Sequence, residues 1–158
     1  LRPEPAPLLD PRGEYLTRVW SQAVYPMAEA RGMTLQLPPV QPRSRKALEA
    51  AEFAREQGKF DEFHLACFRA FFEEGRDIGD PEVLLALGEE VGLARDALQQ
   101  ALATDQYTPK VLADQAEAAR LGITGVPTYI VGERHVVVGA QPYEVLREVT
   151  DRALHERQ

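Results

Sequence analysis

Apolar residues between residues 43 and 121 recur three and four positions apart, the spacing that places them on one face of a helix. The segments that follow this spacing are residues 43–57, 60–74, 80–91, 94–103 and 108–121. Ser44 is the expected N-cap of the first segment. Asp80 and Pro81 mark the start of the third, because Asp accepts hydrogen bonds from first-turn amides and Pro fits the first helical position. No alternating pattern interrupts this stretch, so we predict that it is all-helical.

The chain before residue 43 has a less regular pattern. Four prolines within residues 1–12 predict an extended lead-in, since each proline disfavours helix in the residue before it. Residues 15–31 have helical spacing, with Pro26 inside the pattern, so we expect this helix to kink or restart there. Residues 33–37 alternate briefly, which fits either a short strand or an extended segment.

The pattern changes from helical to strand-like after Leu121. Residues 128–131 and 135–138 are rich in β-branched side chains and are separated by Gly132, Glu133 and Arg134. Two such runs joined by a short glycine-containing link predict a β-hairpin. Pro142 then begins a last helix that continues through Leu154. The chain is therefore expected to end in a strand–strand–helix arrangement.

The turn between these two regions contains Gly125, Val126, Pro127 and Thr128. Proline has no N–H to give to a central strand, so Pro127 is expected at the start of a strand or in a bend. The cis form is accessible to X-Pro bonds and to almost no others. We expect the Val126–Pro127 bond to be cis, with an ordinary trans turn as the alternative.

Composition and charge narrow the classes of partner. The chain has 158 residues, which suits one domain or one domain with an elaboration. Its formal net charge of −7 argues against nucleic acid, whose phosphates require a basic surface. There is also no polybasic patch for an anionic membrane and no apolar run long enough to span one. We therefore expect neither nucleic acid nor membrane as a partner.

The chemically reactive side chains are few and scattered. Cys67 is the single cysteine, so no internal disulfide is formed, which fits a reducing, cytoplasmic location. It lies in an aromatic helical segment, where a free cysteine usually acts as a small apolar residue. A thiol–base pair with His64, three residues earlier, is the less favoured alternative. His64, His135 and His155 have no partners at metal-ligand spacing, so no metal site is expected.

The order of elements and several short motifs resemble a known family. Residues 122–131, residues 135–142 and the closing helix are similar to the C-terminal half of a thioredoxin-like fold. More narrowly they resemble the DsbA family as seen in FrnE-type proteins and the related 2-hydroxychromene-2-carboxylate isomerases. The resemblance covers roughly residues 43–150. It implies an α/β, thioredoxin-like fold with an all-helical insertion domain, predominantly helical overall. Residues 1–42 and 107–158 would form the thioredoxin-like domain, incomplete at its N-terminus, and residues 43–106 the insertion.

This resemblance implies a thiol–disulfide oxidoreductase of the DsbA/FrnE type. The Cys-x-x-Cys or Ser/Cys-containing turn that such proteins carry after their first strand is not present, so we expect no catalytic residue in this chain. The catalytic motif is expected upstream of Leu1, in a longer protein with protein-disulfide oxidoreductase activity. Val126, Pro127 and Thr128 would bind the substrate. The expected partner is a protein or small-molecule thiol or disulfide, with no cofactor and no metal, and a homodimer stays open.

The sequence leaves two alternative functions open. A glutathione-dependent isomerase or transferase for an aromatic substrate would use residues 60–72 as the wall of an apolar pocket and glutathione as cofactor. Glutathione-using relatives tend to carry a Ser-Asp pair where this sequence has Ala140 and Gln141, which disfavours that alternative. The other is a non-catalytic thioredoxin-like binding module.

Overall fold

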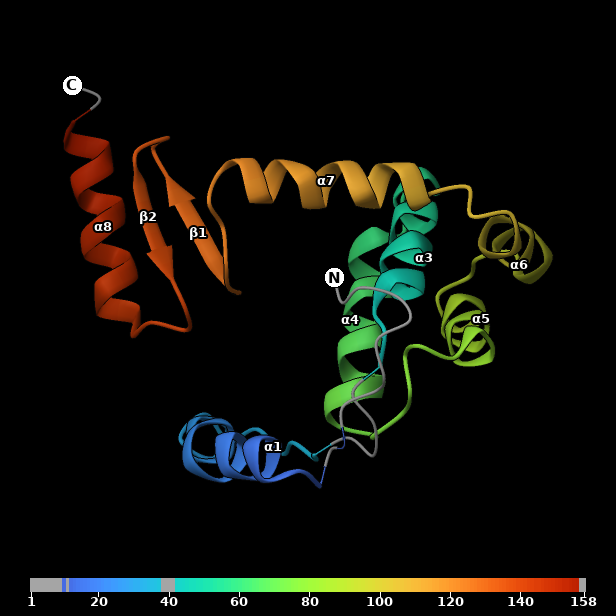
Figure 1. The fold of residues 1–158 in the computed structure, drawn as a ribbon, viewed down its shortest axis with the longest axis horizontal. Helices are drawn as coiled ribbons and strands as arrows, with labels where there is room; N and C mark the ends of the chain where they lie inside the picture. Colours follow the sequence, from blue (N-terminus) through green and yellow to red (C-terminus); the bar gives the residue numbers. More distant parts are fainter. Residues whose placement is uncertain (1–9, 11, 38–41, 157–158) are drawn as a thin grey trace. The chain divides into compact units, whose positions relative to one another are not determined.

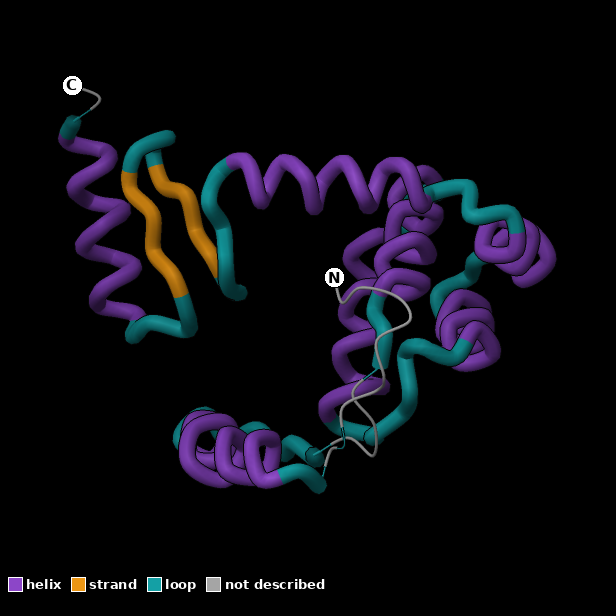
Figure 2. Tube along the Cα trace, viewed as in Figure 1, coloured by secondary structure: helices purple, strands orange, loops and turns teal. Residues whose placement is uncertain are grey.

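The computed structural model describes residues 10, 12–37 and 42–156. The expected extended lead-in over residues 1–12 falls almost entirely outside them. The chain divides into two compact units, Leu1–Leu112 and Ala113–Gln158. Figure 1 labels the elements, and Figure 2 shows that helices dominate and that the described strands form a single hairpin.

The first helical stretch bears out the expected interruption near Pro26. It consists of α1 (Glu14–Val19), the π-helical segment η1 (Trp20–Val24) and α2 (Tyr25–Glu29). The N–H of Tyr25 donates to the carbonyl of Trp20, five residues back, and Pro26 occupies the first turn of α2. A proline has no N–H for the ordinary helical bond, so the α-helical pattern gives way to a wider turn and restarts at Tyr25.

Residues 33–37 do not form a strand in the structure. The extended alternative is the correct one, and the N–H of Gln36 donates to the carbonyl of Phe72 at 2.8 Å.

The helices expected between residues 43 and 121 are all present. They are α3 (Arg45–Glu56), α4 (Phe60–Phe72), α5 (Pro81–Glu90), α6 (Arg95–Ala103) and α7 (Thr108–Arg120). Asp80 caps α5 as predicted, its carboxylate accepting from the Glu82 N–H at 2.9 Å. Ser44 is the N-cap residue of α3, as predicted. Its backbone is near-helical (φ −80°, ψ 0°) instead of extended, and its hydroxyl makes no cap bond.

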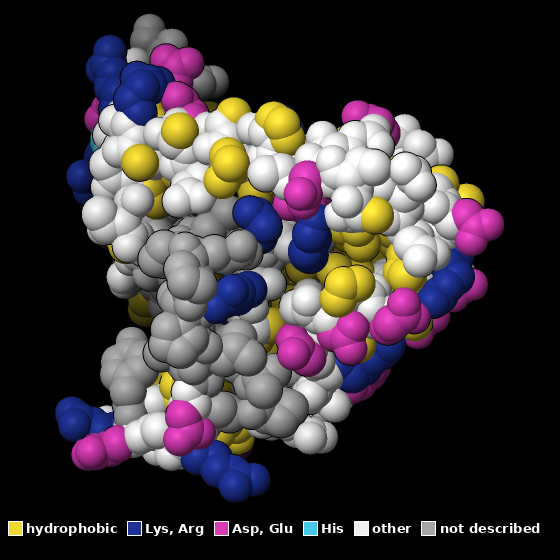
Figure 3. Space-filling view, turned by 45° about the vertical axis from the view of Figure 1, so that its right-hand side comes forward, with side chains coloured by type: hydrophobic (Ala, Val, Ile, Leu, Met, Phe, Trp, Pro, Cys, Tyr) yellow, Lys and Arg dark blue, Asp and Glu magenta, His cyan; other side chains and the backbone are white. Residues whose placement is uncertain are grey.

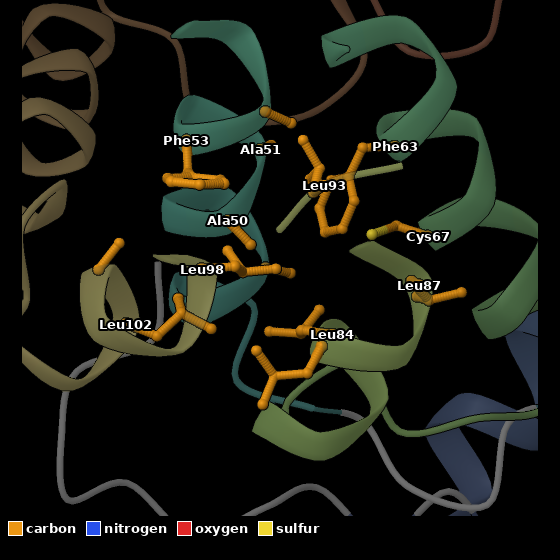
Figure 4. Close-up of a cluster of buried hydrophobic side chains, with 14 of the residues drawn as sticks. Ala50, Ala51, Phe53, Phe63, Cys67, Leu84, Leu87, Leu93, Leu98 and Leu102 are labelled. Atoms are coloured by element: carbon orange, nitrogen blue, oxygen red, sulfur yellow. The ribbon is translucent and has the colours of Figure 1, made fainter. Parts of the chain in front are cut away.

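Helices α3 to α6 enclose a continuous apolar core. Its largest fully buried apolar side chains are Phe63, Leu84, Leu85, Leu87 and Leu98. Figure 4 shows that Phe63 of α4, Leu84 of α5 and Leu98 of α6 lie close together in the core, beside Ala50 of α3. Gly88 allows the close approach of α5 and α6, because a Cβ there would lie 2.7 Å from Cδ2 of Leu98. The helical part thus has a well-packed core of its own.

The second unit contains the predicted hairpin and last helix. Strands β1 (Thr128–Val131) and β2 (His135–Val138) are antiparallel, with Thr128 opposite Val138 and Val131 opposite His135. Gly132 and Glu133 have positive φ (60° and 66°) in the connecting turn. Helix α8 (Tyr143–His155) packs on the hairpin. A Cβ on residue 132 would lie 3.0 Å from the Ala153 methyl. Glycine is therefore required where the hairpin turn packs against α8.

The assignment of residues 1–42 and 107–158 to one domain and residues 43–106 to another stays a prediction. Within the described ranges, none of the helices combines the length and apolar character needed to cross a bilayer. On the face shown in Figure 3, acidic and basic side chains are interspersed and do not form a large patch of one sign.

Candidate functional site

The candidate site is the turn that links α7 to β1. Helix α7 closes with Gly122 at φ 71°, and the Ile123 N–H donates back to the Ala118 carbonyl at 2.9 Å. The Val126–Pro127 peptide bond is cis. The Thr128 hydroxyl donates to the Gly125 carbonyl at 2.7 Å, bridging the turn from one side to the other. This bond holds the two ends of the turn together.

The three predicted site residues lie together on this turn. The Val126 side chain is 91% exposed, Pro127 is exposed and Thr128 is half-buried. Within the described part of the chain, Val126 makes no backbone hydrogen bond. An apolar side chain and its peptide groups are thus presented to solvent on a turn whose ends are fixed. Their role in substrate binding stays a prediction.

The outer edge of β1 continues this exposed surface. The Gly139 N–H donates to the Pro127 carbonyl at 2.8 Å, which makes Pro127 and Gly139 a hydrogen-bonded pair. Since such pairs alternate along an antiparallel ladder, the peptide groups of Thr128 and Ile130 point away from β2. Among the described residues β1 pairs with β2 alone. The edge therefore offers donors and acceptors for one further extended segment.

Cys67 is not part of this site. It is buried in the helical core, and Figure 4 shows its sulfur among the core side chains near Phe63. Burial raises the pKa of the Cys67 thiol to about 12, and the nearby charge of Arg76 offsets this only in part. The geometry supports the structural interpretation over the catalytic one, because an unactivated thiol is a poor nucleophile.

His64 is held by aromatic side chains. Its ring stacks on Phe60 with centroids 5.1 Å apart and meets the edge of Phe68 at 4.7 Å. In the described residues no hydrogen bond joins it to Cys67. Nor does that part of the chain contain three or more His, Cys, Asp or Glu side chains grouped to hold a metal.

Two further polar features are the corner after β2 and a buried carboxylate on α3. The Gln141 side-chain amide donates to the Val138 carbonyl at 2.9 Å, so it closes the corner locally. The buried Glu49, which pairs with Lys46, was not anticipated from the sequence. The sequence features that indicate the pairing are the spacings of Glu49 from Arg45 and Lys46, four and three residues along α3.

Comparison with known proteins connects this arrangement to a family. A family model described as the DSBA-like thioredoxin domain matches residues 8–150. The chain belongs to that family. Among curated proteins, it is 36% identical over 164 residues to the uncharacterized protein YwbO of Bacillus subtilis (strain 168). That match covers 100% of this chain and 78% of YwbO.

Two solved structures are similar to this chain. The crystal structure of the probable DsbA oxidoreductase SCO1869 from Streptomyces coelicolor has a TM-score of 0.76 and 28% identity, covering 90% of this chain and 68% of that one. A crystal structure from Nitrosomonas europaea, with a TM-score of 0.73 and 18% identity, covers 97% of this chain and 79% of that one and shows the fold alone. The DsbA-family resemblance and the thioredoxin-like, mostly helical α/β fold inferred from the sequence are confirmed.

Proposed function

We propose that this chain belongs to a thiol–disulfide oxidoreductase of the DsbA/FrnE type in which Val126, Pro127 and Thr128 form the substrate-side wall. The observation that carries the proposal is the 91% exposed Val126, on a fixed turn directly before strand β1, which among the described residues pairs with β2 alone. An extended substrate segment can add to such an edge through its main chain.

The wall suits thiol–disulfide exchange for a chemical reason. A thiolate must attack one sulfur of a disulfide while the other leaves as a thiolate, so the substrate segment has to be held beside the nucleophile. Main-chain pairing with an edge strand holds a segment without selecting its side chains. The exposed Val126 adds an apolar contact that does not compete for the sulfur.

The nucleophile is assigned by this proposal to a Cys motif upstream of Leu1, in a longer protein. Cys67, with its pKa raised to about 12 by burial, does not provide it. YwbO and the Streptomyces protein both extend beyond the parts that match this chain. The proposal further includes a cytoplasmic location and a protein or small-molecule disulfide as substrate, without a cofactor.

The test uses the natural full-length gene product in an insulin-type reduction assay and in oxidation of a reduced protein. We expect activity in one direction, and Cys67→Ala should retain it. Val126→Lys should raise KM, whereas Tyr143→Lys, at a side chain 69% exposed on α8, should not. Absence of activity in both directions would overturn the proposal.

The glutathione-dependent alternative is tested by measuring glutathione binding. Ala140 and the locally bonded Gln141 offer no charged partner for the glutamyl ammonium group at this corner. We therefore expect no glutathione binding by calorimetry at millimolar concentration. Binding there, together with absence of disulfide exchange, would replace the oxidoreductase proposal with the isomerase or transferase.

A further inference from the structure

Helix α4 carries apolar side chains on two opposite faces. Phe63, Cys67 and Ala70 are buried and belong to the helical core. Because an α-helix turns by about 100° per residue, Leu65 and Phe68 lie on the outer side of α4, and each is 49% exposed. A surface helix normally has polar side chains on its outer side, whereas a helix that is apolar all round is covered. The outer face of α4 is therefore suited to contact with a partner.

Helices α5 and α6 of the same unit do not have a second apolar face. All of their residues are described, and none of their large apolar side chains is exposed. Their exposed residues are Pro81, Glu82, Glu89, Glu90, Asp96, Ala97, Gln99, Gln100 and Ala103. The apolar outer face is thus a property of α4 and not of the helical unit as a whole.

The rings on the outer face of α4 hold one another in position. Phe68 stacks on Phe72 with ring centroids 5.9 Å apart, and Phe72 stacks on Trp20 of η1 at 6.0 Å. His64 meets Phe68 edge-on at 4.7 Å. Rings that are already fixed lose little conformational freedom when a partner covers them. This face is therefore preorganised for an apolar contact.

Two opposite charges flank this face on one side. Glu62 and Arg69 are both exposed and are seven residues apart, which places them on the same side of α4, about 10 Å from each other along its axis. Oε1 of Glu62 lies 3.4 Å from Nζ of Lys59, and both of these side chains are exposed. Within the described part of the chain, the Arg69 guanidinium forms no ion pair. Both flanking charges are therefore available to a partner.

A second copy of this chain matches this combination of apolar centre and opposite flanking charges. In a contact about a two-fold axis, each residue that contacts another is contacted in the same way in return. Two α4 helices packed antiparallel, with Leu65 of each copy against Phe68 of the other, bring Glu62 of each copy beside Arg69 of the other. A parallel pair would instead place like charges at the same level. Flanking charges of this kind set the orientation of paired helices.

We propose that the outer face of α4 is a homodimer interface in which two copies of this helix pack antiparallel. Leu65 and Phe68 form its apolar centre, and Glu62 and Arg69 form its charged edge. One pair of helices buries less than the roughly 1,200 Å² at the lower end of stable interfaces, so association is weak and depends on concentration. The inference does not rest on the proposed thiol chemistry, because a dimer can form whether or not the protein exchanges disulfides.

The first test measures the mass of the whole chain by sedimentation equilibrium from about 1 μM to about 1 mM, the range in which weak interfaces associate. We expect a monomer–dimer equilibrium. Phe68→Glu should weaken it at least about tenfold, because it brings a carboxylate into the apolar centre of the interface. Leu48→Glu on α3, at a side chain 39% exposed, is the matched control and should leave dimerisation unchanged. Circular dichroism checks that each variant is folded.

An exchange of charges tests the antiparallel contact between copies. Glu62→Arg and Arg69→Glu should each weaken dimerisation about tenfold at low salt, because each places like charges opposite one another twice in the dimer. The double variant that carries both changes recreates both pairs and should regain the original dimerisation.

Three outcomes contradict the proposal. A monomer throughout the concentration range would overturn it and leave the outer face of α4 to another segment or a different partner. Dimerisation that is not weakened by Phe68→Glu would place the interface elsewhere on the molecule. A double charge variant that dimerises no better than the single variants would exclude the antiparallel pairing.

Discussion

Helices α3 to α6 and the β1–β2–α8 segment differ sharply in how much apolar surface they bury. The helices enclose a continuous cluster of buried side chains, nine of which, all apolar, are no more than 2% exposed. In the described residues of the second unit, only Val137 and Ala153 are buried. Because hydrophobic stabilisation scales with buried apolar area, most of it resides in the helical unit.

The hairpin has two unlike faces. By the strand register, Tyr129 and Val137 share the face that carries α8, whereas Ile130, Val136 and Val138 share the opposite face. These last three are 46%, 59% and 53% exposed. The candidate site is thus on the region with less burial, whereas Cys67 is buried in the deep core of the other region. The side chains that bury most apolar surface and the residues of the candidate site therefore lie in different parts of this chain.

The largest expected effect tests the core of the helical unit. Phe63→Ala removes a ring that is 0% exposed, and we expect a loss of about 3–5 kcal/mol in unfolding free energy, from lost transfer energy and the cavity left behind. Leu65→Ala on the same helix, at a side chain 49% exposed, is the control and should change it by less than about 1 kcal/mol. Urea unfolding followed by circular dichroism measures both, and equal losses would contradict the comparison.

The second prediction concerns Cys67 in the same core. Its pKa, raised by burial from 9.0 to about 12, implies roughly a thousandfold lower thiolate population at pH 8 than for a solvated thiol. Alkylation by iodoacetamide should therefore be slow in the native protein and fast in urea. The raised pKa also means that stability falls as pH rises above about 9, where the unfolded thiol loses its proton and the folded one keeps it. Rapid native alkylation would show an exposed thiol.

The spacing of apolar residues and the residues that start or end elements are enough to predict most helices and strands. Apolar spacing, the Asp80-Pro81 helix start and the glycine-containing link between the strands are each determined by residues close in sequence. The interruption near Pro26 follows from the missing N–H of one residue. Such features depend on backbone chemistry within a few positions, so the sequence is sufficient for them.

Contacts between residues far apart in the sequence cannot be predicted from local patterns. The Ser44 hydroxyl makes no cap bond although its residue type favours one. The Glu49–Thr108 bond joins residues 59 positions apart, and no local pattern indicates that this carboxylate is buried. Pro127 and the family resemblance indicate the candidate turn, but which peptide groups of β1 point away from β2 depends on the strand register.

A smaller effect is expected in the second unit. Val137→Ala removes two methylene equivalents from a side chain that is 7% exposed, about 1.6 kcal/mol at 0.8 per methylene. Hydrogen exchange should quicken in β1, β2 and α8 and stay unchanged in α3 to α6. Val136→Ala, next along the strand but 59% exposed on the opposite face, is the matched control and should have little effect. Faster exchange throughout the chain would show that the two units unfold together.

The smallest expected effect comes from the exposed pair that joins β2 to α8. Nε2 of His135 lies 3.0 Å from Oε2 of Glu156, and the side chains are 23% and 43% exposed. We expect Glu156→Gln to cost about 0.2–1 kcal/mol, because solvent screens a pair at this exposure, and the cost should shrink further in 1 M salt. Glu148→Gln is the control, since it breaks a pair with Arg152 that lies within α8 alone. Exchange at the His135 and Val137 amides, which face β1, should quicken only for Glu156→Gln. Equal behaviour of the two variants would mean that α8 is held on the hairpin by the Val137 and Ala153 contacts alone.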